Sequence, residues 1–267
     1  MRYSTEILDP AALTDAERQR FTDDLYATHC RIFRGVSRDE FAAYVVDSPA
    51  GYTRIFLLRD EEGTLRGYCA FHVFIKAHAD GPMAVVRMET GTEKAWRRSS
   101  SSGPFIFREL LRLCVRYPRH RRLLVASLVH PSPYVAMHRH APEMWPTPRQ
   151  PTPPHIAALL GELAEMFQMT PAARSGIVKV GWVTRDACAP RRISPEAAFF
   201  TARNPDYLRG EGMVTMIPLS LGHIVQGAAS YARYRLRRLA GGPTATTWAP
   251  GEWGPAGETA GGSAPHS

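Results

Sequence analysis

One short stretch of the chain combines residue types that bind phosphate groups. Two arginines, four serines and a glycine follow one another between residues 97 and 103. An apolar run at 83–90 precedes them, and apolar residues at helical spacing follow them up to Tyr117. The pattern predicts a strand, a loop and a helix, and the start of such a helix directs unpaired N–H groups and the positive end of its dipole at one point. We therefore expect a phosphate or diphosphate to bind there. The expected binding residues are Arg97, Arg98, Ser99, Ser100, Ser101, Ser102 and Gly103.

The same loop has a plainer interpretation. A serine-rich segment can simply connect a strand to a helix, and serine carries a Cβ atom that keeps a phosphate further from the backbone than glycine does. Serine also offers a hydroxyl donor. The position of the loop between a strand and a helix, inside a larger order of elements, is what favours a binding site.

Composition indicates a globular protein with an ordinary core. The chain has 267 residues, of which 44% are hydrophobic and 22% are charged. No window approaches the roughly 18 apolar residues of a membrane span, and the N-terminus lacks the apolar core of a signal peptide. Four cysteines lie far apart, as expected for buried thiols in a reducing compartment. These features predict a cytoplasmic protein.

Positive charge is the strongest bias of the composition. The formal net charge is +8, mostly from arginine. The basic clusters are scattered over different elements and no helix-turn-helix pattern accompanies them, which argues against nucleic acid as a partner. Residues 221–239 repeat apolar positions at helical spacing beside four arginines. Such a helix either packs on the domain or lies on an anionic membrane surface, so peripheral membrane contact is one expectation.

The first half of the chain predicts a regular order of elements. Capping-box patterns at Thr14 and Ser37 open two helices, and residues 60–63 join two strands in a hairpin. The strand at 83–90, the loop and a helix come next. A continuous apolar run at 122–129 predicts a strand buried on both faces, and a short helix starts at Pro131. A strand before and a strand after one helix imply a right-handed parallel crossover.

The second half is less regular. A proline-rich break precedes an amphipathic helix at 155–169, strands are expected at 177–183 and 212–217, and a helix is expected at 221–239. Glycine, proline, alanine and threonine dominate the C-terminal segment, which predicts disorder. We therefore expect a core at 1–147, a helix and strand extension packed on it at 148–241, and a disordered tail at 242–267.

The order of elements from Thr14 to His140 resembles the GNAT superfamily of acyl-CoA N-acyltransferases. The superfamily has an Arg/Gln-x-x-Gly-x-Gly/Ala loop that cradles the coenzyme A diphosphate. Arg98 to Gly103 fits this spacing with Ser101 in place of the first glycine, and a second register begins at Arg97. The resemblance implies an α/β fold with a mixed sheet, acetyl-CoA or a longer acyl-CoA as co-substrate, and an amine as acceptor.

Acyl transfer to an amine needs a base, a donor to the carbonyl oxygen and an acid for the thiolate. The resemblance assigns the base to Glu89, the backbone donors to Met88 through Thr90, and the acid to Tyr134. His130, directly after a predicted strand, is a further candidate because imidazole titrates near neutral pH. Each has an alternative role: Glu89 as an exposed carboxylate paired with Arg87 or Lys94, Tyr134 as a core residue, and His130 as a turn residue.

Two other kinds of chemistry are disfavoured. His138 and His140 lie two positions apart, so on a helix they point to different faces, and no third ligand has suitable spacing; we expect no metal. Cys69 and Cys114 fall in patterns that predict burial, where a thiol is inert. The leading hypothesis is an acyl-CoA-dependent N-acyltransferase. The alternative is a catalytically degenerate, GNAT-like module that binds coenzyme A or another ligand.

Overall fold

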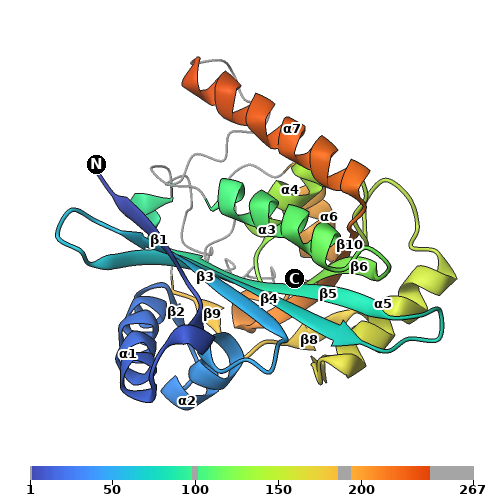
Figure 1. The fold of residues 1–267 in the computed structure, drawn as a ribbon. Helices are drawn as coiled ribbons and strands as arrows, with labels where there is room; N and C mark the ends of the chain where they lie inside the picture. The colour runs from blue at the N-terminus through green and yellow to red at the C-terminus, as the bar shows by residue number, and fades with distance from the viewer. Residues whose placement is uncertain (1, 98–101, 186–193, 241–267) are drawn as a thin grey trace, which may run out of the picture.

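The fold is a mixed α/β arrangement in which helices cover both faces of one large sheet (Figure 1). The computed structural model describes residues 2–97, 102–185 and 194–240. Eight strands form the sheet in the order β1-β3-β4-β5-β6-β10-β8-β7, and β2 pairs with β9. The expected α/β fold with a mixed sheet is confirmed. The strands are β1 (Ser4–Leu8), β2 (Phe33–Arg34), β3 (Tyr52–Arg59), β4 (Leu65–Lys76), β5 (Met83–Thr92), β6 (Arg121–Leu128), β7 (Thr170–Pro171), β8 (Ile177–Lys179), β9 (Val183–Thr184) and β10 (Glu211–Pro218).

Helices occupy two layers. In Figure 1, α3, α4, α6 and α7 lie on one face of the sheet, and α1, α2 and α5 lie on the other. The helices are α1 (Asp15–Ile32), α2 (Arg38–Phe41), α3 (Gly103–Arg116), α4 (Pro131–His140), α5 (Pro154–Met166), α6 (Pro195–Arg203) and α7 (Leu221–Leu239). The short helical turns are η1 (Pro10–Ala12), η2 (Ala42–Val46), η3 (Lys94–Trp96) and η4 (Tyr207–Arg209). Within the described ranges, no helix is long and apolar enough to cross a membrane.

The two N-terminal helices begin where the sequence predicts. The Oγ1 atom of Thr14 accepts from the N–H of Glu17 at 3.4 Å, and the Glu17 carboxylate accepts from the N–H of Thr14 at 2.9 Å. Ser37 and Glu40 form the same reciprocal pair at the start of α2. Each box satisfies two backbone donors that a helix start leaves unpaired, which fixes where α1 and α2 begin.

A tight turn joins β3 and β4. Gly63 adopts a φ of 81°, a conformation that costs glycine nothing and other residues a steric penalty. The N–H of Gly63 donates to the carbonyl oxygen of Asp60, and the side chain of Asp60 accepts from the N–H of Thr64 at 2.7 Å. The predicted hairpin is therefore present, and β4 continues the antiparallel ladder to β5.

The parallel crossover predicted from the sequence places β5 beside β6. The chain leaves β5, passes through α3 and returns in β6, and the two strands pair from Met83 with Arg121 to Arg87 with Val125. A short helix, α4, follows β6 directly. This part of the fold has the element order that the resemblance implies.

The C-terminal half contributes strands to the same sheet. Strand β10 lies between β6 and β8 and is antiparallel to both. Residues 148–241 therefore share the sheet with the first half, while the predicted division at residue 147 stays a prediction. The sequence did not lead us to expect β1 or α6. The predicted disordered tail, 242–267, lies outside the described residues.

The sheet separates two sets of buried side chains. Alternate residues of a strand face opposite sides, so Ala84 and Val86 of β5 pack with α3, α4 and α7, whereas Met83 and Val85 pack with α5. A third cluster fills the space between the sheet and α1 and α2. The strands that carry the site are thus held by packed cores on both faces.

Candidate functional site

Strands β5 and β6 separate partway along their length. Their parallel pairing ends at Arg87 and Val125, but β5 continues to Thr92 against β4, and β6 continues to Leu128 against β10. Among the residues that the structure describes, one edge of β5 therefore has no partner strand beyond Arg87. In an extended strand, alternate residues direct their N–H and C=O groups to the same edge. The gap consequently exposes backbone donors and acceptors of residues 88–92.

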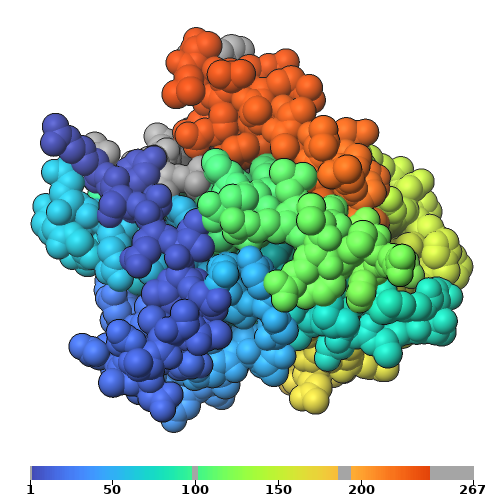
Figure 2. Space-filling view, viewed as in Figure 1, coloured from blue at the N-terminus to red at the C-terminus, as the bar shows by residue number. Residues whose placement is uncertain are grey.

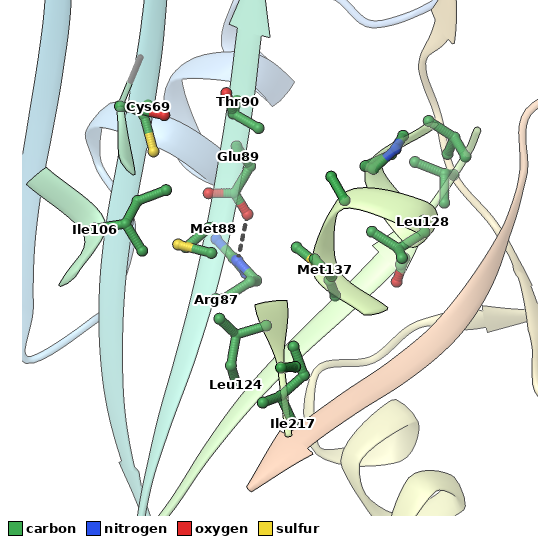
Figure 3. Close-up of a pocket in the computed structure, with 18 of the residues that line it drawn as sticks. Cys69, Arg87, Met88, Glu89, Thr90, Ile106, Leu124, Leu128, Met137 and Ile217 are labelled. Atoms are coloured by element: carbon green, nitrogen blue, oxygen red, sulfur yellow. Dashed lines mark hydrogen bonds and ion pairs between the residues drawn. The ribbon is translucent and has the colours of Figure 1, made fainter. Parts of the chain in front are cut away.

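A cavity of about 680 Å³ occupies this gap. Its size falls within the range of small-molecule sites, roughly 300–1,000 Å³. Residues of β5, β6, α3, α4 and α7 line it, together with residues of α2, η2 and the segment that precedes β9. Figure 3 shows the side chains of β5 and β6 facing each other across the open space, with Ile106 of α3 and Met137 of α4 beside them.

The cavity passes through the sheet, because side chains of both faces of β5 line it. Met88 packs with the cluster beneath α3, α4 and α7, and we call this half the α7 side. Arg87 and Glu89 point to the opposite face, where Tyr44 and Trp182 also line the cavity, and we call this half the Glu89 side. Thr90 follows Glu89 and, by alternation, faces the α7 side.

Glu89 is the centre of a buried polar network. Only 6% of Glu89 is exposed. The Nε atom of Arg87 donates to its Oε1 atom at 2.8 Å, and the Nε2 atom of His72 lies 3.0 Å from its Oε2 atom. The Nδ1 atom of His72 lies 3.0 Å from the hydroxyl of Thr53. A buried carboxylate is stable only when it is paired, and Arg87 supplies that partner.

The second oxygen of Glu89 lies near His72 without a well-formed hydrogen bond. The approach of His72 to Oε2 does not have hydrogen-bond geometry, so Oε2 is buried and without a hydrogen-bond partner within the part of the chain that the structure describes. Most buried polar atoms in proteins are hydrogen bonded, and an exception calls for an explanation such as a catalytic or binding role. Because Glu89 lines the cavity, its carboxylate is placed to accept a proton or to bind a cation there.

Tyr44 and Arg87 form the wall next to this carboxylate. The guanidinium of Arg87 lies 3.7 Å from the centre of the Tyr44 ring, and its Nη2 atom donates to the Tyr44 carbonyl oxygen at 2.7 Å. Burial of the phenol and the negative charge of Glu89 raise the pKa of Tyr44 above its usual range. Tyr44 is therefore a neutral phenol at physiological pH. These contacts hold Arg87, and through it Glu89, in one orientation.

Cys69 also lines the cavity, but as an unreactive thiol. It is 1% exposed, and burial with the nearby charge of Glu89 raises its pKa to about 12. The thiolate, which is the nucleophilic form, is therefore scarce at neutral pH. This agrees with the expectation of a buried cysteine.

The start of α3 closes one end of the cavity. Ser102 and Gly103 line the cavity, and Ser102 makes no side-chain cap to the helix. Arg97 donates from Nε to the carbonyl oxygen of Thr92 at 2.9 Å and borders an adjoining cavity of about 200 Å³ that Ser102 also lines. The other predicted loop residues, Arg98, Ser99, Ser100 and Ser101, lie outside the described residues.

His130 and Tyr134 do not line the cavity, so the structure does not bring them to Glu89. His130 caps α4, where its Nδ1 atom accepts from the N–H of Ser132 at 3.2 Å. Tyr134 is fully buried and donates to the carbonyl oxygen of Pro146 at 3.1 Å. Both side chains thus have the structural roles that we gave as alternatives. The face of α4 that lines the cavity instead carries Pro133, Ala136, Met137 and His140.

Helix α7 covers the cavity, which the sequence did not indicate. A Cβ atom at Gly103 would lie 2.5 Å from Cζ of Tyr231, and one at Gly227 would lie 3.3 Å from Cε1 of Phe107. These two close approaches show that α7 runs antiparallel to α3 and rests on it, as Figure 2 also shows from outside. Glycine at both positions allows the contact.

Comparisons with known proteins give similarity at the level of structure. No protein-family model matches the sequence, and no curated protein matches it. One similar solved structure is a probable N-acyltransferase from Enterococcus faecalis V583, with a TM-score of 0.35 and 9% identity over 52% of this chain and 32% of that chain. The present chain thus spans about a third of that protein's length.

Two further solved structures are similar over about half of the chain. Glucosamine-6-phosphate N-acetyltransferase from Arabidopsis thaliana has a TM-score of 0.32 and 13% identity over 51% of this chain and 89% of that chain. The GNAT family N-acetyltransferase YhbS from Escherichia coli, solved in complex with CoA, has a TM-score of 0.33 and 16% identity over 52% of this chain and 74% of that chain. The order of elements and the parallel β5–β6 pair are those that the resemblance implies, and the expected mixed α/β fold is present.

Proposed function

We propose that this divergent GNAT-like protein is an N-acyltransferase that moves an acyl group from acyl-CoA to an amine. One observation carries the proposal. A cavity passes through the sheet where β5 and β6 separate, and the buried carboxylate of Glu89 lies in its wall. Two reactants can enter such a cavity from opposite faces and meet at the sheet.

The residues at the start of α3 suit the diphosphate of coenzyme A. The first N–H groups of a helix have no intrahelical partner, and the helix dipole favours negative charge there. Ser102 leaves those groups uncapped by its side chain, and Arg97 borders the adjoining small cavity. From the sequence, we predict that Arg98 through Ser101 also belong to this site. When bound, the co-substrate would supply the thioester, which is the activated form of the acyl group.

The open edge of β5 suits the remainder of the co-substrate and the reacting carbonyl. Backbone groups of Met88 to Thr90 face a gap instead of a neighbouring strand. An N–H group of this edge would donate a hydrogen bond to the thioester oxygen as negative charge develops on it. A single preorganised donor of this kind typically changes a rate by about 10²- to 10³-fold.

Glu89 acts as the base. In the overall reaction, an alkylammonium ion and a thioester give an amide, a thiol and one proton, so the nitrogen loses two protons while the thiolate gains one. Glu89 accepts a proton from the amine at Oε2. Arg87 is a positioning residue, because it binds Oε1 of Glu89 and fixes the orientation of the carboxylate.

Release of free thiol from acyl-CoA in the presence of varied amines tests this function, and calorimetry with coenzyme A tests binding separately. We expect both binding and amine-dependent thiol release. Binding without turnover would favour the alternative, a degenerate coenzyme-binding module. Absence of both would contradict the proposal.

We also propose peripheral membrane contact through α7. Its outer face carries an apolar stripe beside arginines at 233, 235, 237 and 238. An apolar stripe flanked by positive charge suits an anionic bilayer surface. The large side chains of the stripe are Leu221, Val225, Leu236 and Leu239, which are 55%, 55%, 65% and 78% exposed.

Co-sedimentation with phosphatidylserine-containing vesicles tests this contact. The variant Arg235→Glu/Arg238→Glu should bind less than the wild type, because each basic residue near the surface contributes roughly 1 kcal/mol. The variant Arg119→Glu/Arg121→Glu makes the same charge change elsewhere on the surface and should bind as the wild type does. Absence of binding by all three proteins would dispose of membrane contact.

A further inference from the structure

We infer that the donor of the proposed reaction is a medium- or long-chain fatty acyl thioester, whose acyl chain lies on the α7 side of the cavity. The inference rests on the proposed function and names the class of acyl group. Three helices form the roof of this half, and each presents one face to the cavity at helical spacing. The roof residues of α3 are Gly103, Ile106, Phe107 and Leu110; those of α7 are His223, Ile224, Gly227 and Tyr231.

The described part of the roof lacks carboxylate, ammonium and guanidinium groups. None of the residues that α3, α4 and α7 contribute to the described wall is an acid, a lysine or an arginine. His140 is the titratable residue of α4 there, and burial with the neighbouring charge of Arg139 lowers its pKa to about 4, so its ring is neutral. The Nδ1 atoms of His140 and His223 already contact Ser230 and Pro218 at 3.1 Å.

Strands β5, β6 and β10 give the same half an apolar floor, and Lys179 of β8 adds a charged side chain to the described wall on this face. In Figure 3, Leu124 of β6 and Ile217 of β10 lie at the lower end of the gap, and Leu128 of β6 lies across it from Met88. The floor residues are Met88, Leu124, Ala126, Leu128 and Ile217. An apolar wall of this extent binds apolar groups, because water in contact with it finds few hydrogen-bond partners.

The direction of this half fits a donor whose acyl chain lies further along α3 than its diphosphate, because the coenzyme arm separates the two. Along α3, the wall runs from Gly103, where we place the phosphates, to Leu110, about 10 Å further on at 1.5 Å per residue. Opposite Leu110, the wall continues with Ile217, Leu219 and Ile224. This end is apolar on the roof and on the floor.

An acetyl group has a single methyl group and would leave most of this apolar surface uncovered. A fatty acyl chain extends past the thioester and covers the apolar end, and each buried methylene contributes about fourfold in affinity. The coenzyme arm, which contains amides, instead finds its partners on the open edge of β5. The acyl chain is therefore the part of the donor that matches the roof and the floor.

Calorimetry and thiol release with acetyl-CoA and octanoyl-CoA test the inference on the full chain. We expect octanoyl-CoA to bind at least about a hundredfold more tightly than acetyl-CoA. Ala136 lines the cavity on an exposed part of α4, so Ala136→Phe should place a ring in the apolar half. This variant should lose most of the preference for octanoyl-CoA while it keeps its affinity for acetyl-CoA.

A matched control and a second variant guard against a general effect of the added ring. Ala198→Phe introduces the same side chain at an exposed position of α6 that does not line the cavity, and it should keep the wild-type preference. Ile106→Phe enlarges the facing roof residue on α3 and should act as Ala136→Phe does. Retention of the wild-type melting temperature identifies the variants that have folded.

Equal affinity for both esters, or an unchanged preference in Ala136→Phe and Ile106→Phe, would overturn the inference and leave the proposed function standing. If neither ester bound, the proposed function itself would fail, and the chain-length inference with it. The inference is supported if the wild type binds octanoyl-CoA more tightly than acetyl-CoA and if Ala136→Phe and Ile106→Phe both abolish this preference.

Discussion

The two sides of the cavity differ in the polarity of the side chains that line them, although residues of strand β5 line both sides. On the α7 side, Met88 of β5 faces a roof whose described residues include no acid, lysine or arginine, and most of the floor is apolar. On the Glu89 side, the next residue faces a paired guanidinium, a histidine and aromatic rings. Because side chains alternate along a strand, a single residue step separates an apolar surface from a reactive carboxylate. Chemistry and substrate fit can therefore be disturbed independently, by substitutions on opposite faces of the sheet.

The largest expected effect comes from removing the base on the Glu89 side. Glu89→Gln keeps an acceptor for Arg87 but cannot take up a proton, so thiol release should fall by about 10²- to 10⁴-fold. Affinity for coenzyme A should stay the same, because its expected contacts lie elsewhere. Glu40→Gln, which neutralises the other carboxylate of the cavity wall, serves as the control. A Glu89→Gln variant with wild-type turnover would remove Glu89 from the mechanism.

Breaking the ion pair on the same side should lower stability. Arg87→Met leaves the Glu89 carboxylate buried without its cation, a change that typically costs about 3–5 kcal/mol of unfolding free energy. Urea denaturation measures the loss. The double variant Arg87→Met/Glu89→Gln should recover a large part of it, because the stranded charge is gone. If the double variant were as unstable as the sum of the single changes, the two side chains would not be coupled.

The Glu89 side should also be sensitive to acid. His29 packs against Trp182 and Phe33 of this wall, and burial lowers its pKa to about 4 from an ordinary value near 6.5. Protonation therefore favours the unfolded chain. The stability that His29 contributes is complete above about pH 6.5 and decreases by about 3 kcal/mol as the pH falls to about 4.

Urea denaturation at a series of pH values checks this behaviour. His29→Gln should flatten the decrease between pH 6.5 and 4, whereas His223→Gln on α7 should keep it. An identical pH profile for wild type and His29→Gln would assign the acid sensitivity to other groups.

The smallest effect is expected at the entrance. Arg97→Ala/Arg98→Ala should weaken coenzyme A binding by about tenfold, the value of one charge-assisted hydrogen bond, and should leave the fold intact. Arg98 is included in this variant on the basis of the sequence alone. Calorimetry measures the change, with Arg209→Ala as an exposed control. Unchanged affinity in the double variant would count against the diphosphate site at the start of α3.

Local patterns predicted the elements that depend on local contacts. The capping boxes at Thr14 and Ser37 and the hairpin at residues 60–63 are formed by neighbours in the chain. The continuous apolar run of β6 predicted a buried strand, although its partner strands β5 and β10 are distant in sequence. Strand β1 was missed because its residues are mostly exposed at the sheet edge and lack alternation. Helix α6 was missed although Ser194 and Pro195 are a recognisable helix start.

The site was predicted only where strand periodicity determines it. Glu89 and the backbone beside it follow from their place on β5, and Arg87 shares the face of Glu89 because it lies two residues away. The sequence could not show that this pair is buried, since Tyr44 and Trp182 reach it from distant segments. Tyr134 lies on a different face of α4 from the residues that line the cavity. Which face of α4 is directed at the cavity depends on how the helix packs on the sheet. The roof formed by α7 is likewise a long-range contact.

A crystal structure of the protein with octanoyl-CoA tests the central claim most directly. We predict the diphosphate at the start of α3, the thioester in the gap between β5 and β6 within reach of Glu89, and the acyl chain among Ile106, Met137 and Ile217. A coenzyme bound outside this gap, or an acyl chain on the Glu89 side, would contradict the assignment of the two sides of the cavity.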